Sequence, residues 1–173
     1  MINEQANVST VGPLDINLAQ KDLNMKLELK WTEGMRFQAD CDTHSVNMDA
    51  KSPIGNHSAM TPKELVGAGL GGCTAMDVIA LLKKHRQSYE SLVVDIDIST
   101  SSGGQPVVFT GATLAFKAKG QIEPSILLES VRLSQTKYCG VSAMLVKAFP
   151  IRYTVSLNDQ VIGEGHADFS ESH

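Results

Sequence analysis

The sequence contains few of the residues that mark several common classes of protein. Aromatic residues make up 5% of its 173 residues, and cysteine occurs three times. Cys41, Cys73 and Cys139 lie far apart, and an odd number of dispersed cysteines does not fit the disulfide framework of a small secreted domain. We therefore expect reduced cysteines, and a bond between two of them would form as part of a reaction.

A basic face, a secretion signal and a regular metal-ligand spacing are also missing. Fifteen Lys and Arg against 19 Asp and Glu give a formal net charge of -4, which argues against a nucleic-acid-binding protein. The N-terminus lacks a basic segment followed by an apolar run, and the apolar stretches are short and rich in glycine, so neither a signal peptide nor a bilayer span is expected. No HxxxH or CxxC spacing occurs, so we predict no metal and no cofactor in a cytoplasmic protein.

What the chain does contain is typical of one globular domain. Hydrophobic residues amount to 42% and charged residues to 20%. Residues 1–24 have no clear period and are assigned to an N-terminal extension, residues 25–165 to the domain, and residues 166–173 to a loose tail. Apolar and polar residues alternate in segments 25–31 and 35–41, which predicts two strands that form a hairpin, the first of them half-buried. A third short strand is expected at 45–49.

A long helix is predicted from Thr61 to about Lys84. Thr61, Pro62 and Glu64 form a capping box with proline at the first helical position. The middle of this helix is apolar almost all the way round, which predicts burial on most sides.

The rest of the chain predicts an α+β fold. Two strands are expected at 92–100 and 107–120, and a second helix begins at Pro124, breaks near Gly140 and restarts. A strand at 151–157 then turns back toward a final strand. Strands separated by two long helices, without regular βαβ alternation, indicate α+β rather than a doubly wound sheet.

Four glycines, at 67, 69, 71 and 72, stand inside the first helix just before Cys73. Gly67, Gly69 and Gly72 match the GxGxxG pattern, but a dinucleotide-binding turn needs a helix that begins within the pattern, and here the helix has already begun. Each glycine costs about 1 kcal/mol relative to alanine. We therefore predict that these glycines let another backbone approach closely, such as a helix of a second subunit. A buried helix without chemistry is the alternative.

Cys73 lies about three turns into this helix, too far for the helix dipole to lower the pKa of its thiol. An isolated buried cysteine is more often inert than nucleophilic. Activation of Cys73 would require a cation from elsewhere, and Arg36 in the first hairpin is the candidate. Asp77 shares the face of Cys73 and needs a partner, either a Lys or Arg side chain or a backbone hydrogen bond.

Two segments together resemble the two cysteine regions of the OsmC/Ohr family. They are TPKELVGAGLGGCTAMDVIALLKKHR, which contains Cys73, and SQTKYCGVSAMLVKAFPI, which contains Cys139. The resemblance covers roughly residues 25–157 and is greatest to the OsmC-like branch. It implies an OsmC-like α+β fold with antiparallel sheets and two long helices, the central one buried in an intertwined homodimer.

The same resemblance implies a thiol-dependent peroxidase that reduces organic hydroperoxides. In that family the first cysteine, here Cys73, becomes a sulfenic acid, the second, here Cys139, resolves it to a disulfide, and a dithiol such as dihydrolipoamide restores both thiols. Arg36 is the nearest match to the activating arginine. Glu64 is the nearest acid to hold it, one residue after the family's position, which is Lys63 here.

The sequence leaves two other functions open. One is a non-enzymatic dimeric protein that binds a small molecule in an apolar crevice near the cysteines. The other is a redox sensor that forms the disulfide without fast turnover. Lys63 at the acid position favours the non-enzymatic protein, and the usual Cys-Pro-x-Ser of the second motif is replaced by Cys139, Gly140, Val141 and Ser142.

Overall fold

The computed structural model describes residues 25–170, which form two compact units on either side of the boundary between Ala59 and Met60. We call them the N-terminal unit and the C-terminal unit. The extension predicted for residues 1–24 and the end of the predicted tail lie outside the described residues.

The N-terminal unit is a three-stranded antiparallel sheet in the order β1-β2-β3. Its strands are β1 (Glu28–Glu33), β2 (Arg36–Cys41) and β3 (His44–Met48), which confirms the predicted hairpin and third strand. The predicted half-burial of the apolar face is wrong for β1, because Leu29 is 56% and Trp31 64% exposed. Among residues 25–59, no other segment covers that face.

After β3, Asp49 organises the loop that follows. Its carboxylate accepts hydrogen bonds from the backbone N–H groups of Ala50, Asn56 and Ser58 and from the Ser58 hydroxyl, at 2.7–3.2 Å. The Ser58 hydrogen bonds, followed by those of Ala50 and Asn56, hold the pKa of Asp49 below its usual value. A buried carboxylate thus fixes a loop that has little apolar packing of its own.

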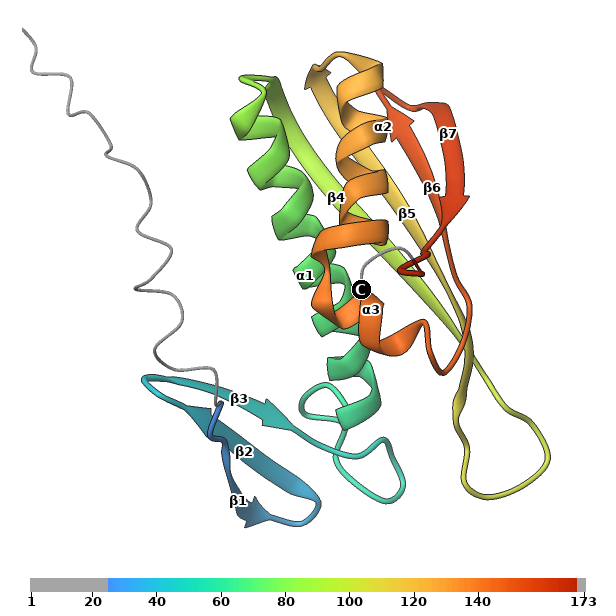
Figure 1. Ribbon diagram of the computed structural model, residues 1–173. Helices are drawn as coiled ribbons and strands as arrows, with labels where there is room; N and C mark the ends of the chain where they lie inside the picture. Colours follow the sequence, from blue (N-terminus) through green and yellow to red (C-terminus); the bar gives the residue numbers. More distant parts are fainter. Residues whose placement is uncertain (1–24, 171–173) are drawn as a thin grey trace, which may run out of the picture. The chain divides into compact units, whose positions relative to one another are not determined.

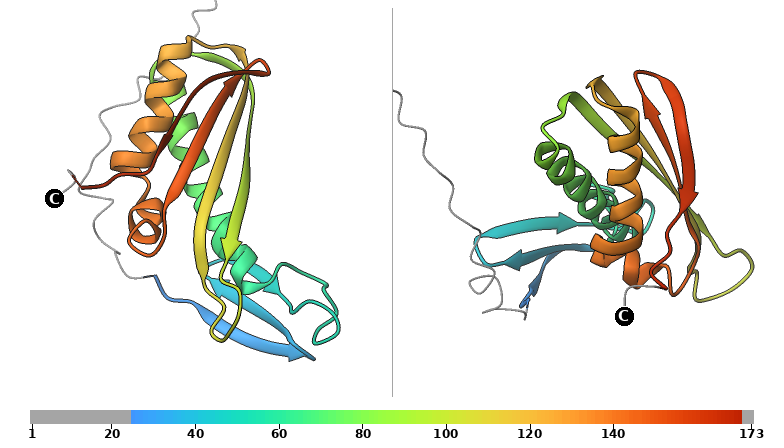
Figure 2. Two further views of the ribbon diagram at one scale, coloured as in Figure 1. Left: turned by 90° about the vertical axis from the view of Figure 1, so that its right-hand side faces the viewer. Right: turned by 45° about the horizontal axis from the view of Figure 1, so that its top comes forward.

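The C-terminal unit places its helices on one face of a four-stranded sheet in the order β4-β5-β6-β7 (Figures 1 and 2). All pairs are antiparallel except β5–β6, which is parallel because the intervening helices form the crossover that parallel strands need. The elements are α1 (Pro62–Lys84), β4 (Ser88–Thr100), β5 (Phe109–Gln121), α2 (Pro124–Leu133), η1 (Ser134–Tyr138), α3 (Gly140–Leu145), β6 (Ile151–Leu157) and β7 (Gln160–His166).

The predicted start of α1 is confirmed. Thr61 is the N-cap, its hydroxyl accepts the Glu64 amide at 3.3 Å, and the Glu64 carboxylate accepts the Thr61 amide at 2.8 Å. By length and composition α1 could span a membrane, contrary to the expectation from its glycines. However, its buried side chains pack on α2 and the sheet, as in the core helix of a folded domain.

The core of the C-terminal unit lies between the helices and the sheet. Fully buried side chains come from both helices and from the central strands, so this unit has a complete interior of its own. The largest apolar ones are Leu70, Val78 and Leu82 of α1, Leu127 and Val131 of α2, and Leu114, Phe116, Ile151 and Val155 of the sheet.

The second half of the helical region differs from one continuous helix. After α2 the chain widens into the π-helical turn η1, and α3 then begins with Cys139 as its N-cap. The predicted break near Gly140 is therefore confirmed, but the π-helical turn was not foreseen. After β7, Ala167 donates a backbone hydrogen bond to Ile151 and Asp168 donates one to Gln135, so the beginning of the predicted loose tail is attached to the unit.

The glycines of α1 divide into two pairs. A Cβ at Gly67 would lie 3.0 Å from Ile98 Cδ1, and one at Gly71 would collide with Ile96 Cδ1, so this pair lets β4 approach the helix. A Cβ at Gly69 or at Gly72 would meet open space. Close approach by the chain itself thus explains only the first pair.

Candidate functional site: a paired thiol beside a carboxylate

Three side chains in the C-terminal unit bring reactive atoms together. Cys73 and Asp77 stand one turn apart on α1, and Cys139 opens α3 from the other side. The Sγ atoms of Cys73 and Cys139 and a carboxylate oxygen of Asp77 all lie within 4.8 Å of one another. Both cysteines are free thiols. The fold therefore joins the two cysteines that the sequence separates by 65 residues.

The two thiols have different surroundings. Cys139 is completely buried, whereas Cys73 is only half-buried. Burial raises the pKa of Cys139 to about 11, and the nearby Cys73 contributes in the same direction, while Ser142 opposes the shift. Cys139 is therefore a protonated thiol at neutral pH, and Cys73 is the thiol that a molecule from solution reaches first.

The π-helical turn positions Cys139. Residues of η1 shift the chain so that Ser134 and Gln135 point inward and are buried. The Cys139 amide donates to the Ser134 carbonyl, and the Ser142 amide donates to the Cys139 Sγ at 3.3 Å. Such π-turns often occur at functional sites. Sequence reasoning placed Cys139 at a break but could not show which side chains the break turns inward.

A chain of hydrogen bonds runs from η1 to Asp77. Gln135 Nε2 donates to Thr74 Oγ1 at 2.6 Å, and Ser134 Oγ donates to Asp77 Oδ2 at 3.0 Å. Thr74 Oγ1 and Ser134 Oγ are 2.7 Å apart. Because Ser134 gives its only proton to Asp77, Thr74 must donate to Ser134, so all donors point toward the carboxylate.

Asp77 carries a carboxylate that has no cationic partner in the described part of the chain. Desolvation raises its pKa, and the Ser134 hydrogen bond lowers it in part. The predicted partner of Asp77, a Lys or Arg side chain or a backbone hydrogen bond, is wrong, since the partner is the Ser134 hydroxyl. No cationic side chain of the described residues forms an ion pair with it.

Arg36 belongs to the N-terminal unit, where it begins β2. One of its guanidinium nitrogens lies 3.9 Å from Glu33 Oε1, and its buried Nε has no hydrogen-bond partner within the described chain. Its role as the activating cation for Cys73 stays a prediction.

Glu64 closes the cap of α1 and stands nine residues before Cys73, which is about 13 Å along a helix axis. Its role as the partner of an activating arginine likewise stays a prediction. Lys63, at the family's acid position, points its ammonium to the backbone carbonyl of Val107 in the loop before β5.

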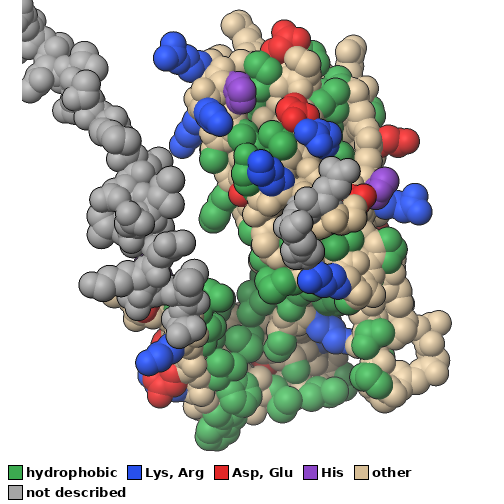
Figure 3. Space-filling view, in the orientation of Figure 1, with side chains coloured by type: hydrophobic (Ala, Val, Ile, Leu, Met, Phe, Trp, Pro, Cys, Tyr) green, Lys and Arg blue, Asp and Glu red, His purple; other side chains and the backbone are tan. Residues whose placement is uncertain are grey.

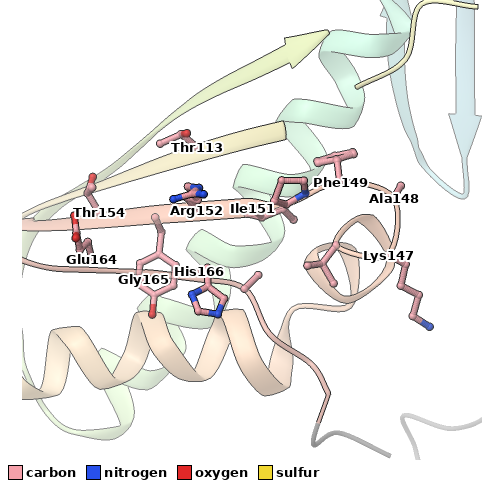
Figure 4. A pocket seen from close by; sticks show the side chains of 14 residues that line it. Thr113, Lys147, Ala148, Phe149, Ile151, Arg152, Thr154, Glu164, Gly165 and His166 are labelled. Atoms are coloured by element: carbon pink, nitrogen blue, oxygen red, sulfur yellow. The ribbon is translucent and has the colours of Figure 1, made fainter. Parts of the chain in front are cut away.

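A separate groove of about 890 Å³ lies along β5, β6, β7 and the segment after α3, and neither cysteine lines it. Thr113, Arg152 and His166 lie on these three neighbouring strands (Figure 4), and the strand register pairs Thr113 with Arg152 and Arg152 with His166. The groove therefore runs across neighbouring strands of the sheet, away from the paired cysteines. On the face seen in Figure 3, acidic and basic side chains are scattered over the C-terminal unit, in keeping with the small net charge.

The C-terminal unit is an α+β domain in which a half-buried and a buried cysteine lie close together. Comparison with known proteins identifies the family to which such a domain belongs. The family model for OsmC-like proteins matches residues 55–154. Protein YhfA of Escherichia coli K12 is 34% identical over 135 residues, which cover 75% of this chain and 96% of YhfA. The chain belongs to the OsmC/Ohr family, as the resemblance predicted.

Solved structures share the fold. An OsmC-like protein from Mycoplasma pneumoniae matches with a TM-score of 0.69 and 15% identity over 79% of this chain and 98% of its own. An organic hydroperoxide resistance protein OsmC from Legionella pneumophila matches with a TM-score of 0.60 and 18% identity over 79% and 99%. These likenesses confirm the α+β, OsmC-like fold.

Proposed function

We propose that this protein is a thiol-dependent peroxidase that reduces organic hydroperoxides through Cys73 and Cys139. The observation that carries the proposal is the approach of the two sulfur atoms, from distant parts of the chain, to within 4.8 Å. The similarity to a structure described as an organic hydroperoxide resistance protein supports the choice of substrate class.

The difference in burial assigns the two roles. The half-buried Cys73, as thiolate, attacks the terminal peroxide oxygen, so that the O–O bond breaks, an alcohol leaves and Cys73 becomes a sulfenic acid. The Cys139 thiol then attacks the Cys73 sulfur, and a disulfide and water form. A dithiol such as dihydrolipoamide reduces the disulfide by thiol exchange. Stabilisation of the thiolate by Arg36, with Glu64 as its acidic partner, belongs to this proposal, as does a cytoplasmic location.

A homodimer is also part of the proposal. Val66, Gly69, Gly72, Met76 and Ala80 follow one another on α1 at spacings of three and four, the pattern of a helix-packing seam. Val66 is 40% and Met76 74% exposed, and a Cβ at Gly69 would meet open space. A second copy packed along this seam would cover the apolar stripe and explain the second glycine pair.

Oxidation in the Cys41→Ser background tests the reaction, because this variant leaves only the two proposed cysteines. One equivalent of cumene hydroperoxide should yield a Cys73–Cys139 disulfide by peptide mass spectrometry, and dihydrolipoamide should sustain turnover. Cys73→Ser should abolish turnover, and Cys139→Ser should leave a Cys73 sulfenic acid that a cyclic dione traps. If Cys73 and Cys139 both remained free thiols in the presence of excess peroxide, the proposed peroxidase function would be wrong.

One observation favours the redox sensor as a second candidate. Burial raises the pKa of the Cys139 thiol to about 11, so little of it is thiolate at neutral pH, and a slow resolving thiol suits a sensor better than a peroxidase. Stoichiometric oxidation without sustained turnover by the dithiol would support the sensor.

A further inference from the structure

We propose that the reduced protein binds a thiophilic divalent cation, Zn²⁺ above all, through Cys73 Sγ, Cys139 Sγ and the Asp77 carboxylate. The proposal goes beyond the peroxidase and does not depend on it, because binding needs only the reduced pair. The sequence has no regular spacing of metal ligands, but the fold brings ligands from α1 and from the start of α3 together.

The distances suit such an ion. The three donor atoms lie within 4.8 Å of one another. Zinc takes sulfur ligands at about 2.3 Å and carboxylate oxygens at about 2.0–2.2 Å, so tetrahedral coordination places donor atoms roughly 3.5–3.8 Å apart. The donors would move inward by about 1 Å at most. Cys73 and Asp77 are half-buried, so the ion enters from their side and a water completes its coordination.

The chain of hydrogen bonds fixes the orientation of the Asp77 carboxylate, as is usual for a metal ligand. Ser134 donates to Asp77 Oδ2, and the Thr74 and Gln135 side chains fix Ser134 in turn. The other oxygen, Oδ1, is left for an ion. Groups that orient a ligand in this way contribute about 10–100-fold to metal affinity.

Charge gives the second argument. The Asp77 carboxylate has no ion-pair partner among residues 25–170, although it is half-buried. A divalent cation accounts for all three groups at once, because it balances the carboxylate and favours both thiolates.

The site is therefore available only in the reduced protein. A Cys73–Cys139 disulfide converts both sulfurs into non-ligands, so oxidation should release the ion. Conversely, bound zinc should shield Cys73 from peroxide.

Cadmium provides a direct spectroscopic test, since cadmium bound to thiolates absorbs in the ultraviolet. Reduced, metal-free protein in the Cys41→Ser background is titrated with Cd²⁺ under nitrogen, and Zn²⁺ affinity is measured against a chromophoric chelator. We expect one ion per chain with two thiolates bound, and no binding after oxidation to the disulfide.

Variants decide whether this is the proposed site. Asp77→Asn keeps the size and the Ser134 hydrogen bond and should weaken zinc binding about 10-fold or more. Asp97→Asn, which removes an exposed carboxylate of β4, is the matched control and should bind as the parent does. Absence of the cadmium band in the reduced parent protein, binding that survives in Cys73→Ser or Cys139→Ser, or unchanged affinity in Asp77→Asn would each overturn the proposal. The circular dichroism spectrum of each variant confirms that it is folded.

Discussion

The two units obtain their order in different ways. The C-terminal unit buries large side chains from helices and strands around Leu127 and Phe116, both 0% exposed. In the N-terminal unit the buried residues among those described are Ala39 and Asp49 alone, and Leu29 and Trp31 stay more than half exposed. A small sheet needs a packed apolar face to be stable. The C-terminal unit thus has its own core, whereas the N-terminal sheet depends on apolar cover that its own residues do not supply.

The largest contrast should come from deleting one leucine in each unit. Leu127→Ala removes a fully buried side chain from the core and should lower the free energy of unfolding by about 2–5 kcal/mol. Leu29→Ala removes an exposed side chain and should cost less than about 1 kcal/mol. Urea unfolding of both variants measures the difference. An equally large loss for Leu29→Ala would reveal that another molecule buries the β1 face in solution.

The next largest loss of stability should come from removing a buried hydrogen bond of the C-terminal unit. Ser134→Ala removes the donor to Asp77 and leaves Thr74 without its acceptor, so we expect a loss of about 1–3 kcal/mol. Asp77 would also lose the hydrogen bond that opposes the rise of its pKa. Ser125→Ala, at the exposed start of α2, is the control. Equal unfolding curves for the two variants would show that the chain of hydrogen bonds contributes little to stability.

In the N-terminal unit the corresponding feature is Asp49, and its effect should depend on pH. The folded-state pKa of Asp49 lies below the ordinary value of 3.8, so its contribution is complete above that value and is lost as the pH falls through the folded pKa. Asp49→Asn should therefore destabilise the protein at pH 7 and progressively less toward pH 3. Unfolding across this range, with Asp97→Asn as the control, measures the effect. If the difference in unfolding free energy between the parent protein and Asp49→Asn did not decrease as the pH falls, the stabilising role of the Asp49 carboxylate would be contradicted.

The sequence predicts the parts of this molecule that local patterns encode. The alternation in β1–β3 and the capping box of Thr61, Pro62 and Glu64 give the elements correctly. The pairing of Cys73 with Cys139 came from resemblance to a family. Local spacing could not supply it, because the crossover through α2 and η1 sets that contact.

Two features were beyond reach for physical reasons. The π-helical turn has no clear sequence pattern, so the inward positions of Ser134 and Gln135 were not predicted. The hydrogen-bond donor to the Asp77 carboxylate is the hydroxyl of Ser134, on another helix. The sequence predicted a charged or backbone partner and gave no sign of this donor. Exposure of the β1 face was missed because alternation reports which side chains share a face and gives no information on what covers it.

The smallest effects on stability should come from the glycines of α1. One face of this helix is covered by β4 and the other is exposed, so the comparison of covered and exposed surfaces applies within a single helix. Gly71→Ala places a methyl group against Ile96, so the gain in helix propensity is offset, and we expect a net loss of about 1 kcal/mol or less with no change in self-association.

Gly69→Ala meets open space within the chain and should leave the intrinsic stability equal or raise it by up to about 1 kcal/mol. If a second copy packs along the seam of Val66, Gly69 and Met76, however, the added methyl group separates the helices and should raise the dimer dissociation constant. Sedimentation velocity over a range of concentrations measures that constant for both variants. Weakened association in Gly69→Ala alone would place the seam on the outer face. Unchanged association in Gly69→Ala would exclude this face as the contact, and the second glycine pair would then have no packing reason.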